Sequence, residues 1–476
     1  MPLCGSVHMP NGMLMPKSLF RSFGSRPSLP AILLCCLMIM LWIAGGASRS
    51  DVLGQALVRL SAAVMLAIAL LWGPRPDLAG GRAVAILLGL TIVLVVLQLV
   101  PLPPSVWTAL PGRSVFDALP RIGVAPSWRP LAMVPGAAAN ALFSLIVPLS
   151  VFLLLTMMPV RERTWLLDFY LALIAASALW ALLQFSGGGF NNPLVNQTPG
   201  QVSGNFANRN HLALFLALGC LLAPVWTFAS RRLTTIRVVS GIGLLVLLIL
   251  LILATGSRAG VALGLVAVVI ALFQVRSQLL HMSRRLPRWG FPVIIIGLVV
   301  TIALAILFSL KADRAVGIDR LMDVDISDDM RRQALPTILS MVSQYFPVGT
   351  GFGSFDPMFR MHEPNDLLKL SYFNHAHNDY LEIALNAGLA GIVLLASAIG
   401  WWLVNSIRVW RRTSLSNSRL GRSGSAMLLL ILVASAFDYP ARTPLIMAMV
   451  VAAAMWMGWS LTDTRRSPLP DQKVDL

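Results

Sequence analysis

The chain has 476 residues, of which 57% are hydrophobic and only 12% are charged, whereas charged residues make up about 25% of a typical soluble domain. Its apolar residues also fall into unbroken runs of about 18 to 25, the length that crosses the roughly 30 Å hydrocarbon core of a bilayer. This composition excludes an ordinary soluble globular protein and indicates a polytopic membrane protein. The formal net charge of +17 would by itself suggest a nucleic-acid partner, so it has to be weighed against the topology.

The N-terminal segment, residues 1–30, is rich in Met, Pro and Ser and contains Lys17, Arg21 and Arg26. It has the basic character of a signal-peptide start, but no small-residue cleavage site follows the apolar stretch, which favours a retained first helix. The cysteines have neither metal-ligand nor redox spacing, and we interpret them as small apolar residues. They are Cys4, Cys35, Cys36 and Cys220.

Twelve apolar runs predict an all-α fold with about 12 transmembrane helices. The runs lie near residues 31–48, 52–72, 83–101, 139–158, 163–185, 208–229, 236–254, 258–275, 291–310, 378–405, 425–438 and 443–461.

The distribution of Lys and Arg predicts the orientation. With the N-terminus inside, seven successive cytoplasmic segments all carry basic residues and together hold 22 of the 37 Lys and Arg, against five acids. This surplus equals the whole net charge of +17, so the charge reports positive-inside topology and not a nucleic-acid partner. An even number of helices then places both termini, including the tail 463–476, in the cytoplasm.

Two loops on the outer, periplasmic side are long. The first, 102–138, is rich in Pro and belongs to the segment 31–199, which contains the N-terminal transmembrane helices. The second, 311–377, belongs to the segment 200–462 and holds seven basic and nine acidic residues. A structureless loop of this length is improbable in a compact protein, so we expect it to be partly folded and functional. A helix is predicted over 329–346, with Asp328 and Asp329 at its start.

A glycine run in the second loop places Gly349, Gly351 and Gly353 at alternate positions. Such a run either brings backbone N–H groups close to an anion or simply forms a turn after the surface helix. No Lys-Ser or Lys-Thr pair follows it, so it is not a nucleotide-binding P-loop.

Polar residues gather just before the run 378–405, in Asn374-His375-Ala-His377-Asn378-Asp379. The spacing of His375 and His377 would suit a metal, but no third ligand is obvious. Asn378 or Asp379 would cap the following helix and hold His377 at the membrane surface. Because histidine accepts a proton near neutral pH, His377 is the candidate general base.

Three arginines are candidate phosphate ligands. Arg258 lies in a short outer turn where it is the only basic residue, although an arginine near a helix end can also snorkel to the interface. Arg331 and Arg332 open the predicted loop helix. A guanidinium group binds phosphate oxygens in a bidentate manner.

Two further outer turns are polar. One contains Asn208, Asn210 and His211, and the other contains Asp438 and Arg442. Their side chains would either hydrogen-bond sugar hydroxyl groups or cap the adjoining helices.

These features, taken in order over residues 200–445, resemble the O-antigen ligase and polymerase superfamily of bacterial envelope enzymes. The matching segments are Gly204-Asn-Phe-Ala-Asn208 through Asn210-His211, Thr255-Gly-Ser-Arg258, Arg331 with Pro347-Val-Gly-Thr-Gly351, His377-Asn378 followed after nine residues by Gly388-Leu-Ala-Gly391, and Asp438-Tyr439-Pro440. The His-Asn-x9-Gly-x-x-Gly pattern is the most specific of them. The helices before residue 200 are similar to the family in hydropathy only.

The resemblance implies a GT-C-like, metal-independent, inverting glycosyltransferase of the bacterial inner membrane. It needs no cofactor and has its active site on the periplasmic face. The donor would be a polyprenyl-diphosphate-linked glycan, such as one carried on undecaprenyl diphosphate, and the acceptor a lipid core, as in lipopolysaccharide, or another lipid-linked glycan. By this resemblance His377 matches the catalytic histidine, and Arg258 and Arg331 match the arginines that hold the diphosphate, with Arg332 one register away. The remaining candidates would bind glycan or acceptor, or support the site; they are Asn208, Asn210, His211, His375, Asn378, Asp438 and Arg442.

Two other functions stay open. A polysaccharide polymerase would use the same diphosphate site and base as a ligase, so the motifs do not separate them. A non-catalytic polysaccharide or lipid transporter would instead have charged residues near the membrane midplane and discontinuous helices. Arg59, within the second apolar run, is the main interior charge.

Overall fold

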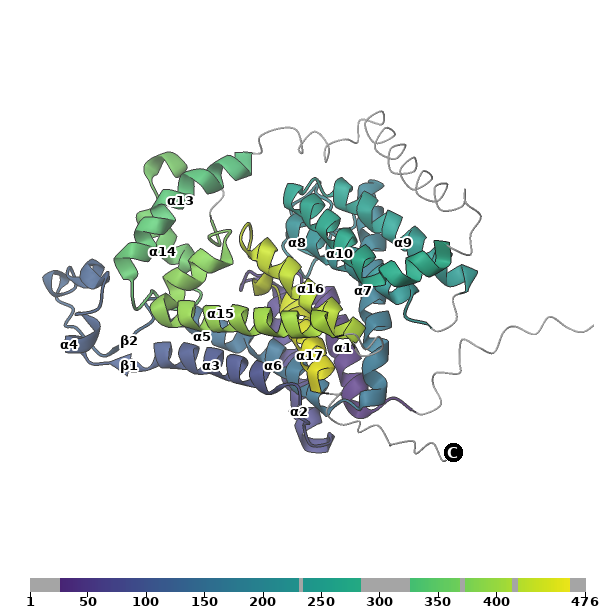
Figure 1. Cartoon of the computed structure of the whole chain (residues 1–476). Coiled ribbons are helices and arrows are strands. Elements are labelled where there is room, and N and C mark those ends of the chain that lie inside the picture. Colours follow the sequence, from purple (N-terminus) through teal and green to yellow (C-terminus); the bar gives the residue numbers. More distant parts are fainter. Residues whose placement is uncertain (1–25, 231–233, 284–325, 369–372, 413–417, 463–476) are drawn as a thin grey trace, which may run out of the picture.

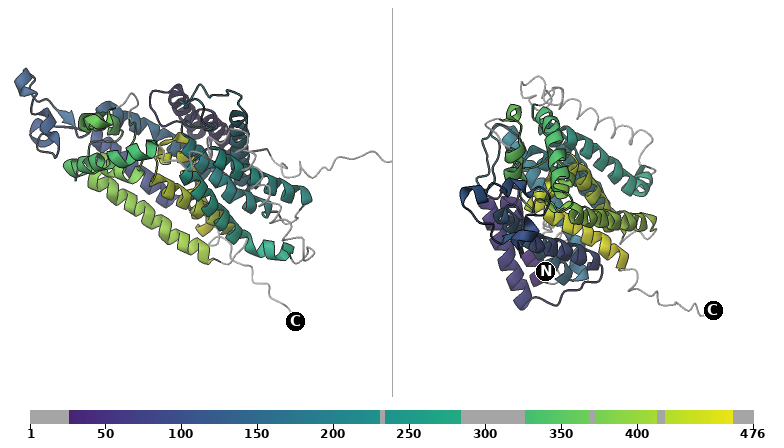
Figure 2. Two further views of the ribbon diagram at one scale, coloured as in Figure 1. Left: turned by 90° about the horizontal axis from the view of Figure 1, so that it is seen from above. Right: turned by 90° about the vertical axis from the view of Figure 1, so that its left-hand side faces the viewer.

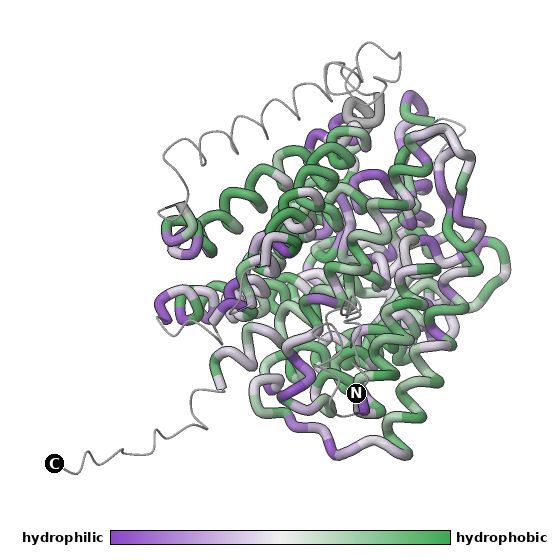
Figure 3. Tube along the Cα trace, turned by 90° about the vertical axis from the view of Figure 1, so that its right-hand side faces the viewer, coloured by the Kyte–Doolittle hydropathy of each residue, from purple (hydrophilic) through white to green (hydrophobic). Residues whose placement is uncertain are grey.

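The computed structural model describes residues 26–230, 234–283, 326–368, 373–412 and 418–462. These residues form a bundle of long helices with a smaller helical region at one end (Figure 1; Figure 2). Apolar residues run along the helices, and hydrophilic ones concentrate towards their ends (Figure 3). The predicted helix 291–310, the C-terminal tail 463–476 and residues 1–25 of the N-terminal tail lie outside the described residues.

The described elements agree with the apolar runs to within a few residues, apart from the longer shifts at the ends of α10, α15 and α16. In chain order they are α1 (Leu29–Ala44), α2 (Leu53–Trp72), α3 (Arg82–Leu99), β1 (Pro101–Leu102), α4 (Pro104–Trp107), η1 (Arg113–Phe116), η2 (Pro120–Ile122), β2 (Arg129–Pro130), α5 (Pro135–Ser144), α6 (Ile146–Met157), η3 (Val160–Trp165), α7 (Leu166–Phe185), α8 (Arg209–Thr227), α9 (Thr235–Ala254), α10 (Arg258–Ser283), α13 (Ile326–Tyr345), α14 (Phe355–His362), η4 (Asn365–Leu367), α15 (Asp379–Arg411), α16 (Ser418–Ser435), η5 (Pro440–Arg442) and α17 (Pro444–Thr462).

The membrane-spanning character of the chain is confirmed. Among the described residues, nine helical segments are long and apolar enough to cross a bilayer, and α1 is a shorter apolar helix of 16 residues. The predicted number of twelve helices and the GT-C-like architecture stay predictions.

Two helices form the centre of the bundle. The apolar stretches of α8 and α17 are 89% and 78% buried, whereas that of α3 is only 17% buried. A helix that is apolar on every side and buried on every side belongs to the interior. The N-terminal end of α8 lines the pocket described below, and α17 begins four residues after Pro440, which also lines it.

The first long loop folds around one tryptophan. Trp107 is buried, its ring meets the edge of Phe116 at 5.4 Å between ring centroids, and its indole N–H donates to the Ser127 carbonyl at 3.0 Å. The loop is closed at its base by the antiparallel pairing of β1 with β2. Figure 1 shows it projecting beyond the end of α3.

The second long loop is partly helical, as predicted. The helix expected over 329–346 is α13, which begins three residues earlier at Ile326. Its buried face, with α14 and the segment before α15, forms a second apolar cluster that includes Ile338, Met341, Tyr345 and Phe359. Residues 311–325 of this loop lie outside the described residues.

The long helix α15 is broken near its start. At Gly388 φ is +53° and ψ is −141°, a conformation that is essentially restricted to glycine. A break in an apolar helix exposes backbone groups that the bilayer cannot hydrogen-bond. This geometry explains the first glycine of the His-Asn-x9-Gly-x-x-Gly pattern.

The glycine run of the second loop seals this break. The N–H groups of Thr350 and Gly351 donate to the carbonyls of Leu385 and Asn386, both at 2.9 Å, and the N–H of Leu389 donates to the Pro347 carbonyl at 2.8 Å. From α3, Gln98 donates to the Asn386 carbonyl at 3.0 Å and accepts from the N–H of Phe352 at 2.9 Å. The loop is thus fixed to the membrane-spanning helices at this point.

We predict that Gly388→Ala destabilises the protein. A Cβ at this position would lie 2.0 Å from the Pro347 carbonyl oxygen, and the backbone conformation itself costs a non-glycine residue about 1–3 kcal/mol. The melting temperature in detergent should fall by several degrees. Gly400→Ala is the matched control in the same helix, because a Cβ there meets nothing within 4 Å. Equal melting temperatures for the two variants would contradict this explanation of the break.

Candidate active site

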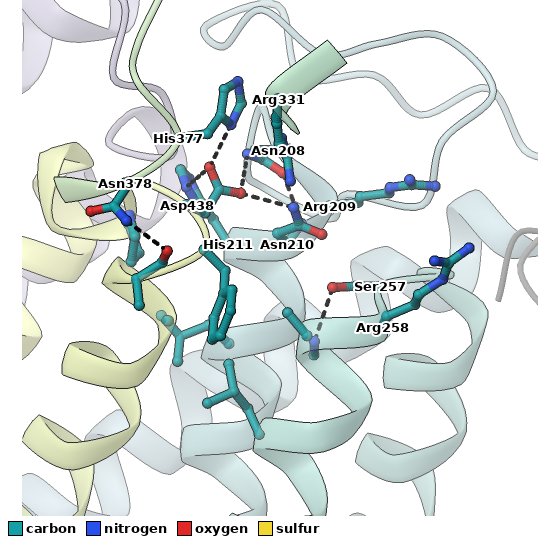
Figure 4. Close-up of a pocket in the computed structure, with 18 of the residues that line it drawn as sticks. Asn208, Arg209, Asn210, His211, Ser257, Arg258, Arg331, His377, Asn378 and Asp438 are labelled. Atoms are coloured by element: carbon teal, nitrogen blue, oxygen red, sulfur yellow. Dashed lines mark hydrogen bonds and ion pairs between the residues drawn. The ribbon is translucent and has the colours of Figure 1, made fainter. Parts of the chain in front are cut away.

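A cavity of about 910 Å³ opens where the second loop meets the helical bundle. Its walls are the N-terminal ends of α8, α10 and α13, the segment just before α15, and the turn between α16 and η5 (Figure 4). The predicted residues Arg258, Arg331, Arg332 and His377 all line it. These residues are up to 119 positions apart in the sequence, and the fold brings them to one pocket.

The carboxylate of Asp438 is the centre of the hydrogen bonding on one side of the pocket. It is only 4% exposed. Asn208 and Asn210 donate to its Oδ2 at 2.9 and 2.8 Å, and the N–H of Tyr439 donates to its Oδ1 at 3.0 Å. His377 Nδ1 lies 3.1 Å from the same Oδ1. Both carboxylate oxygens are therefore held in place by the protein.

The charges around Asp438 and His377 determine which of these two residues carries the shared proton. Burial opposes ionisation of Asp438, but the hydrogen bond from His377, together with the electrostatic effect of neighbouring residues that include Arg331, outweighs burial and holds the pKa of the carboxyl group well below its usual range. An ionised carboxylate only accepts hydrogen bonds, so the proton of the bond must be on His377 Nδ1.

His377 is in turn kept neutral. Burial lowers its pKa below the ordinary 6.5, and Arg331 acts in the same direction, while Asp438 opposes the shift without reversing it. With Nδ1 protonated, Nε2 carries the lone pair. A neutral imidazole oriented by a carboxylate is the arrangement that general bases use in many enzymes.

The backbone at His377 is strained. Its φ is +50°, and within the described residues it is the one residue other than glycine that has a positive φ. Positive φ is uncommon for such residues and concentrates at functional sites. Asn378 stabilises the conformation from the next position: its Oδ1 accepts from the N–H of Leu381 at 3.1 Å, which caps α15, and its Nδ2 donates to the Ala436 carbonyl at 3.0 Å.

Cations line another part of the pocket. Besides the three predicted arginines, Arg209 lines it at the first residue of α8. Figure 4 shows the side chains of Arg209 and Arg258 extending away from His377. The α8 and α10 helices both begin at this wall, each capped by a polar side chain, since Asn208 accepts from Asn210 N at 2.9 Å and Ser257 from Gly260 N at 3.0 Å. Two positive helix ends and four guanidinium groups suit an anion.

Sequence reasoning missed Arg209, although the prediction of a helix starting at residue 208 contained the relevant signal. An arginine in the first turn of a helix opposes the helix dipole, which favours acidic residues there. A cation in that position indicates a role other than stabilising the helix.

His211 lines the pocket but is almost completely enclosed. It is 2% exposed, its Nε2 lies 3.9 Å from Asp438 Oδ1, and neither ring nitrogen has a hydrogen-bond partner among the described residues. Its ring meets the edge of Tyr439 at 5.1 Å.

Two predicted site residues do not line the pocket. Arg442 forms ion pairs with Asp379 at 3.0 Å and with Glu382 at 3.2 Å. His375 Nδ1 lies 3.1 Å from the same Glu382, and its Nε2 lies 3.2 Å from Ser48 Oγ. The structure thus places Arg442 and His375 in an ionic cluster with the buried Asp379 and Glu382, outside the pocket lining. Removing one member of such a cluster would leave a charge without its partner, which typically costs about 3–5 kcal/mol.

Tyr439 connects this cluster with the pocket. Its ring centroid lies 4.3 Å from that of His375 and 4.9 Å from that of His377. Burial, reinforced by the neighbouring Asp438 carboxylate, raises the pKa of Tyr439 above its ordinary value of 10.0, so the phenol is neutral. Sequence reasoning did not identify this packing role.

The glycine run does not form an anion site. Gly349, Gly351 and Gly353 all have positive φ, but the N–H groups of residues 349–352 donate to protein acceptors. The residues of this run are also absent from the pocket lining. Of the two alternatives predicted for this segment, an anion site or a turn, the structure shows the turn.

Part of the pocket lining is apolar. It consists of Leu214, Leu263, Leu335, Ile338, Leu381 and Phe437. The pocket therefore joins a cationic region and an apolar wall, as an amphiphilic ligand requires.

Residues 243–396 match the family model described as O-antigen ligase. Over these residues the match confirms the predicted resemblance to the O-antigen ligase and polymerase superfamily, and it indicates an activity of that type without separating ligase from polymerase. The matched region includes Arg258, Arg331 and His377. No curated protein matches the chain.

The environment of His377 can be tested directly. Because Asp438 raises and Arg331 lowers the pKa of His377, we predict that Asp438→Asn lowers this pKa further and that Arg331→Gln raises it. Histidine NMR titration of the labelled protein in detergent measures both shifts. A raised pKa in Asp438→Asn would contradict the assigned hydrogen bond.

Proposed function

We propose that this protein is a membrane glycosyltransferase that moves a polyprenyl-diphosphate-linked glycan onto an acceptor hydroxyl group in the pocket around His377. The proposal rests on one observation: a single pocket contains a neutral histidine, oriented by a carboxylate, and four arginines. The histidine suits removal of a proton from the acceptor, and the arginines suit binding of the departing diphosphate. The apolar wall suits a polyprenyl chain.

The cationic part of the pocket would hold the diphosphate. Arg258 and Arg331 would bind its oxygens, with Arg209 and Arg332 adding to the positive potential. Charge grows on the bridging oxygen as the glycosyl bond breaks, and preorganised cations stabilise that charge most effectively in a pocket shielded from water. The sugar carbon bonded to this oxygen would then lie between the arginines and His377.

His377 would act as the general base. The acceptor oxygen forms a bond to the anomeric carbon while the bond from that carbon to the diphosphate oxygen breaks. The acceptor proton passes to His377 Nε2, and the polyprenyl diphosphate leaves. Attack from the side opposite the leaving group inverts the anomeric centre. Asp438 stabilises the imidazolium that forms, and the step uses neither metal nor nucleotide.

We place the site on the periplasmic face of a bacterial inner membrane, with both termini cytoplasmic. The support is the excess of Lys and Arg in the alternate loops and the family match. In this setting the reaction would belong to the assembly of lipopolysaccharide or of another surface polysaccharide.

A polymerase that joins lipid-linked repeat units is the second candidate, because the family match includes both activities. Loss of the gene separates them. A ligase mutant should accumulate long lipid-linked polymer, and a polymerase mutant single repeat units. A transporter is less well supported: α15 is discontinuous, but its break is closed by the second loop and by Gln98.

We predict that His377→Ala reduces glycan transfer by the purified protein by about 10²–10⁴-fold, the usual contribution of a general base. Binding of the lipid-linked donor should remain. His281→Ala, at the exposed far end of α10, is the control and should retain activity. Wild-type transfer by His377→Ala would exclude the proposed base.

Arg258→Ala should both weaken donor binding and slow transfer, because the diphosphate loses its contact with Arg258 in the ground state and in the transition state. Arg276→Ala provides a matched control. It lies on the same helix, remote from the pocket, and stacks on Phe273 at 4.1 Å. Unchanged donor affinity in Arg258→Ala would remove this residue from the diphosphate site.

A further inference from the structure

Arg59 is a charged residue in an apolar helix that the transfer reaction does not use. It lies in the second turn of α2, and its guanidinium group bridges to α5. Nη1 donates to Asn140 Oδ1 at 2.6 Å, and Nη2 donates to Gln55 Oε1 at 3.2 Å. Gln55 is itself held by a hydrogen bond from Nε2 to the Ala47 carbonyl. Two neutral amides therefore fix the orientation of the cation.

The charge of Arg59 is not balanced by the residues that the structure describes. Its hydrogen-bond partners, Asn140 and Gln55, are both neutral, and no carboxylate in the described part of the chain lies within ion-pair distance. Its Nε is buried and has no hydrogen-bond partner in the described part of the chain. A cation at membrane depth is costly unless an anion accompanies it, and such residues usually mark a binding site.

The surroundings of Arg59 face the bilayer. Leu60, next to Arg59 in α2, and Phe143, one turn from Asn140 in α5, are 64% and 65% exposed. In a membrane-spanning bundle such side chains contact lipid. An anion that reaches Arg59 from this side would therefore be attached to a lipid.

The depth of Arg59 matches a lipid headgroup. Arg59 is six residues from the start of α2, about 9 Å along the helix, and its contact with Gln55 directs the guanidinium group back towards that start. The same end of the bundle carries the pocket, because Ser48, in the turn before α2, lies 3.2 Å from His375. The guanidinium group thus reaches towards the headgroup layer on the pocket side.

We infer that Arg59, Gln55 and Asn140 form a binding site for the phosphate group of a lipid in the leaflet on the side of the pocket. The planar guanidinium fork binds two phosphate oxygens, Gln55 orients it, and the amide nitrogen of Asn140 supplies a further donor. The site is separate from the pocket around His377 and does not depend on the proposed transfer reaction. If Arg59 served only to brace α2 against α5, loss of its charge would not change lipid binding.

Native mass spectrometry of the full-length protein in detergent tests this inference. The protein is titrated with phosphatidylglycerol, with a glycosyl diacylglycerol that lacks phosphate, and with inorganic phosphate. Wild-type protein should bind phosphatidylglycerol most tightly, and Arg59→Gln should bind it about 10-fold or more weakly, as expected for loss of a charge-assisted contact. Arg121→Gln, an equal charge change on an exposed loop residue, should bind like wild type.

Equal phosphatidylglycerol affinity in wild type and Arg59→Gln would overturn the inference. So would wild-type binding of the glycosyl diacylglycerol as tightly as phosphatidylglycerol, which would show that phosphate is not recognised. Binding of inorganic phosphate as tightly as the lipid would identify a free-anion site instead. If Arg59→Gln fails to fold, Asn140→Ala and Arg59→Lys replace it. The inference requires Asn140→Ala to weaken binding and Arg59→Lys to keep the preference for the phosphate-bearing lipid over the one without phosphate.

Discussion

The buried carboxylate of Asp438 accepts hydrogen bonds from Asn208, Asn210, His377 and the backbone of Tyr439. These donors come from the start of α8, from the segment before α15 and from the turn after α16. A buried charge is tolerated only when its hydrogen-bonding capacity is satisfied, so this one anion requires three remote parts of the chain to meet. The same requirement fixes His377 at the pocket and determines which of its nitrogens carries the proton.

A second constraint positions the loop that supplies His377. Where α15 breaks at Gly388, the freed backbone groups are paired with residues 347–351 and with Gln98 of α3. The hydrophilic loop is thereby joined to the membrane-spanning helices by hydrogen bonds that the bilayer could not replace. Arg331, Arg332 and His377 reach the pocket from the loop, while Arg209 and Arg258 reach it from the bundle. In the proposed reaction, the glycan would meet the loop and the polyprenyl chain the helices.

Much of this arrangement could be predicted from local sequence. Apolar runs located the helices, because length and hydropathy suffice for that purpose. The pairing of polar residues with helix starts located Asn208, Asn378 and α13. Order along the chain, compared with a known superfamily, then selected Arg258, Arg331 and His377 from many polar residues.

What could not be predicted depends on contacts between distant residues. Asn208 and Asp438 are 230 positions apart, and nothing in either turn alone indicates that they touch. The glycine run was ambiguous because its N–H groups find their acceptors in α15, far along the chain. His375 and Arg442 were expected to bind glycan or acceptor or to support the site, and only the tertiary structure shows that both contact the buried Glu382. The position of Tyr439 against three histidine rings likewise follows only from the tertiary structure.

The account depends on Asp438 acting through His377, and a double-mutant cycle on the transfer rate tests this dependence most directly. The rate is measured for wild type, His377→Gln, Asp438→Asn and the double variant, with donor and acceptor saturating. If Asp438 serves to orient and stabilise the base, its loss should matter little once the base is gone, and the double variant should be about as slow as His377→Gln alone. Losses that multiply in the double variant would show that the two residues act independently and would contradict the account.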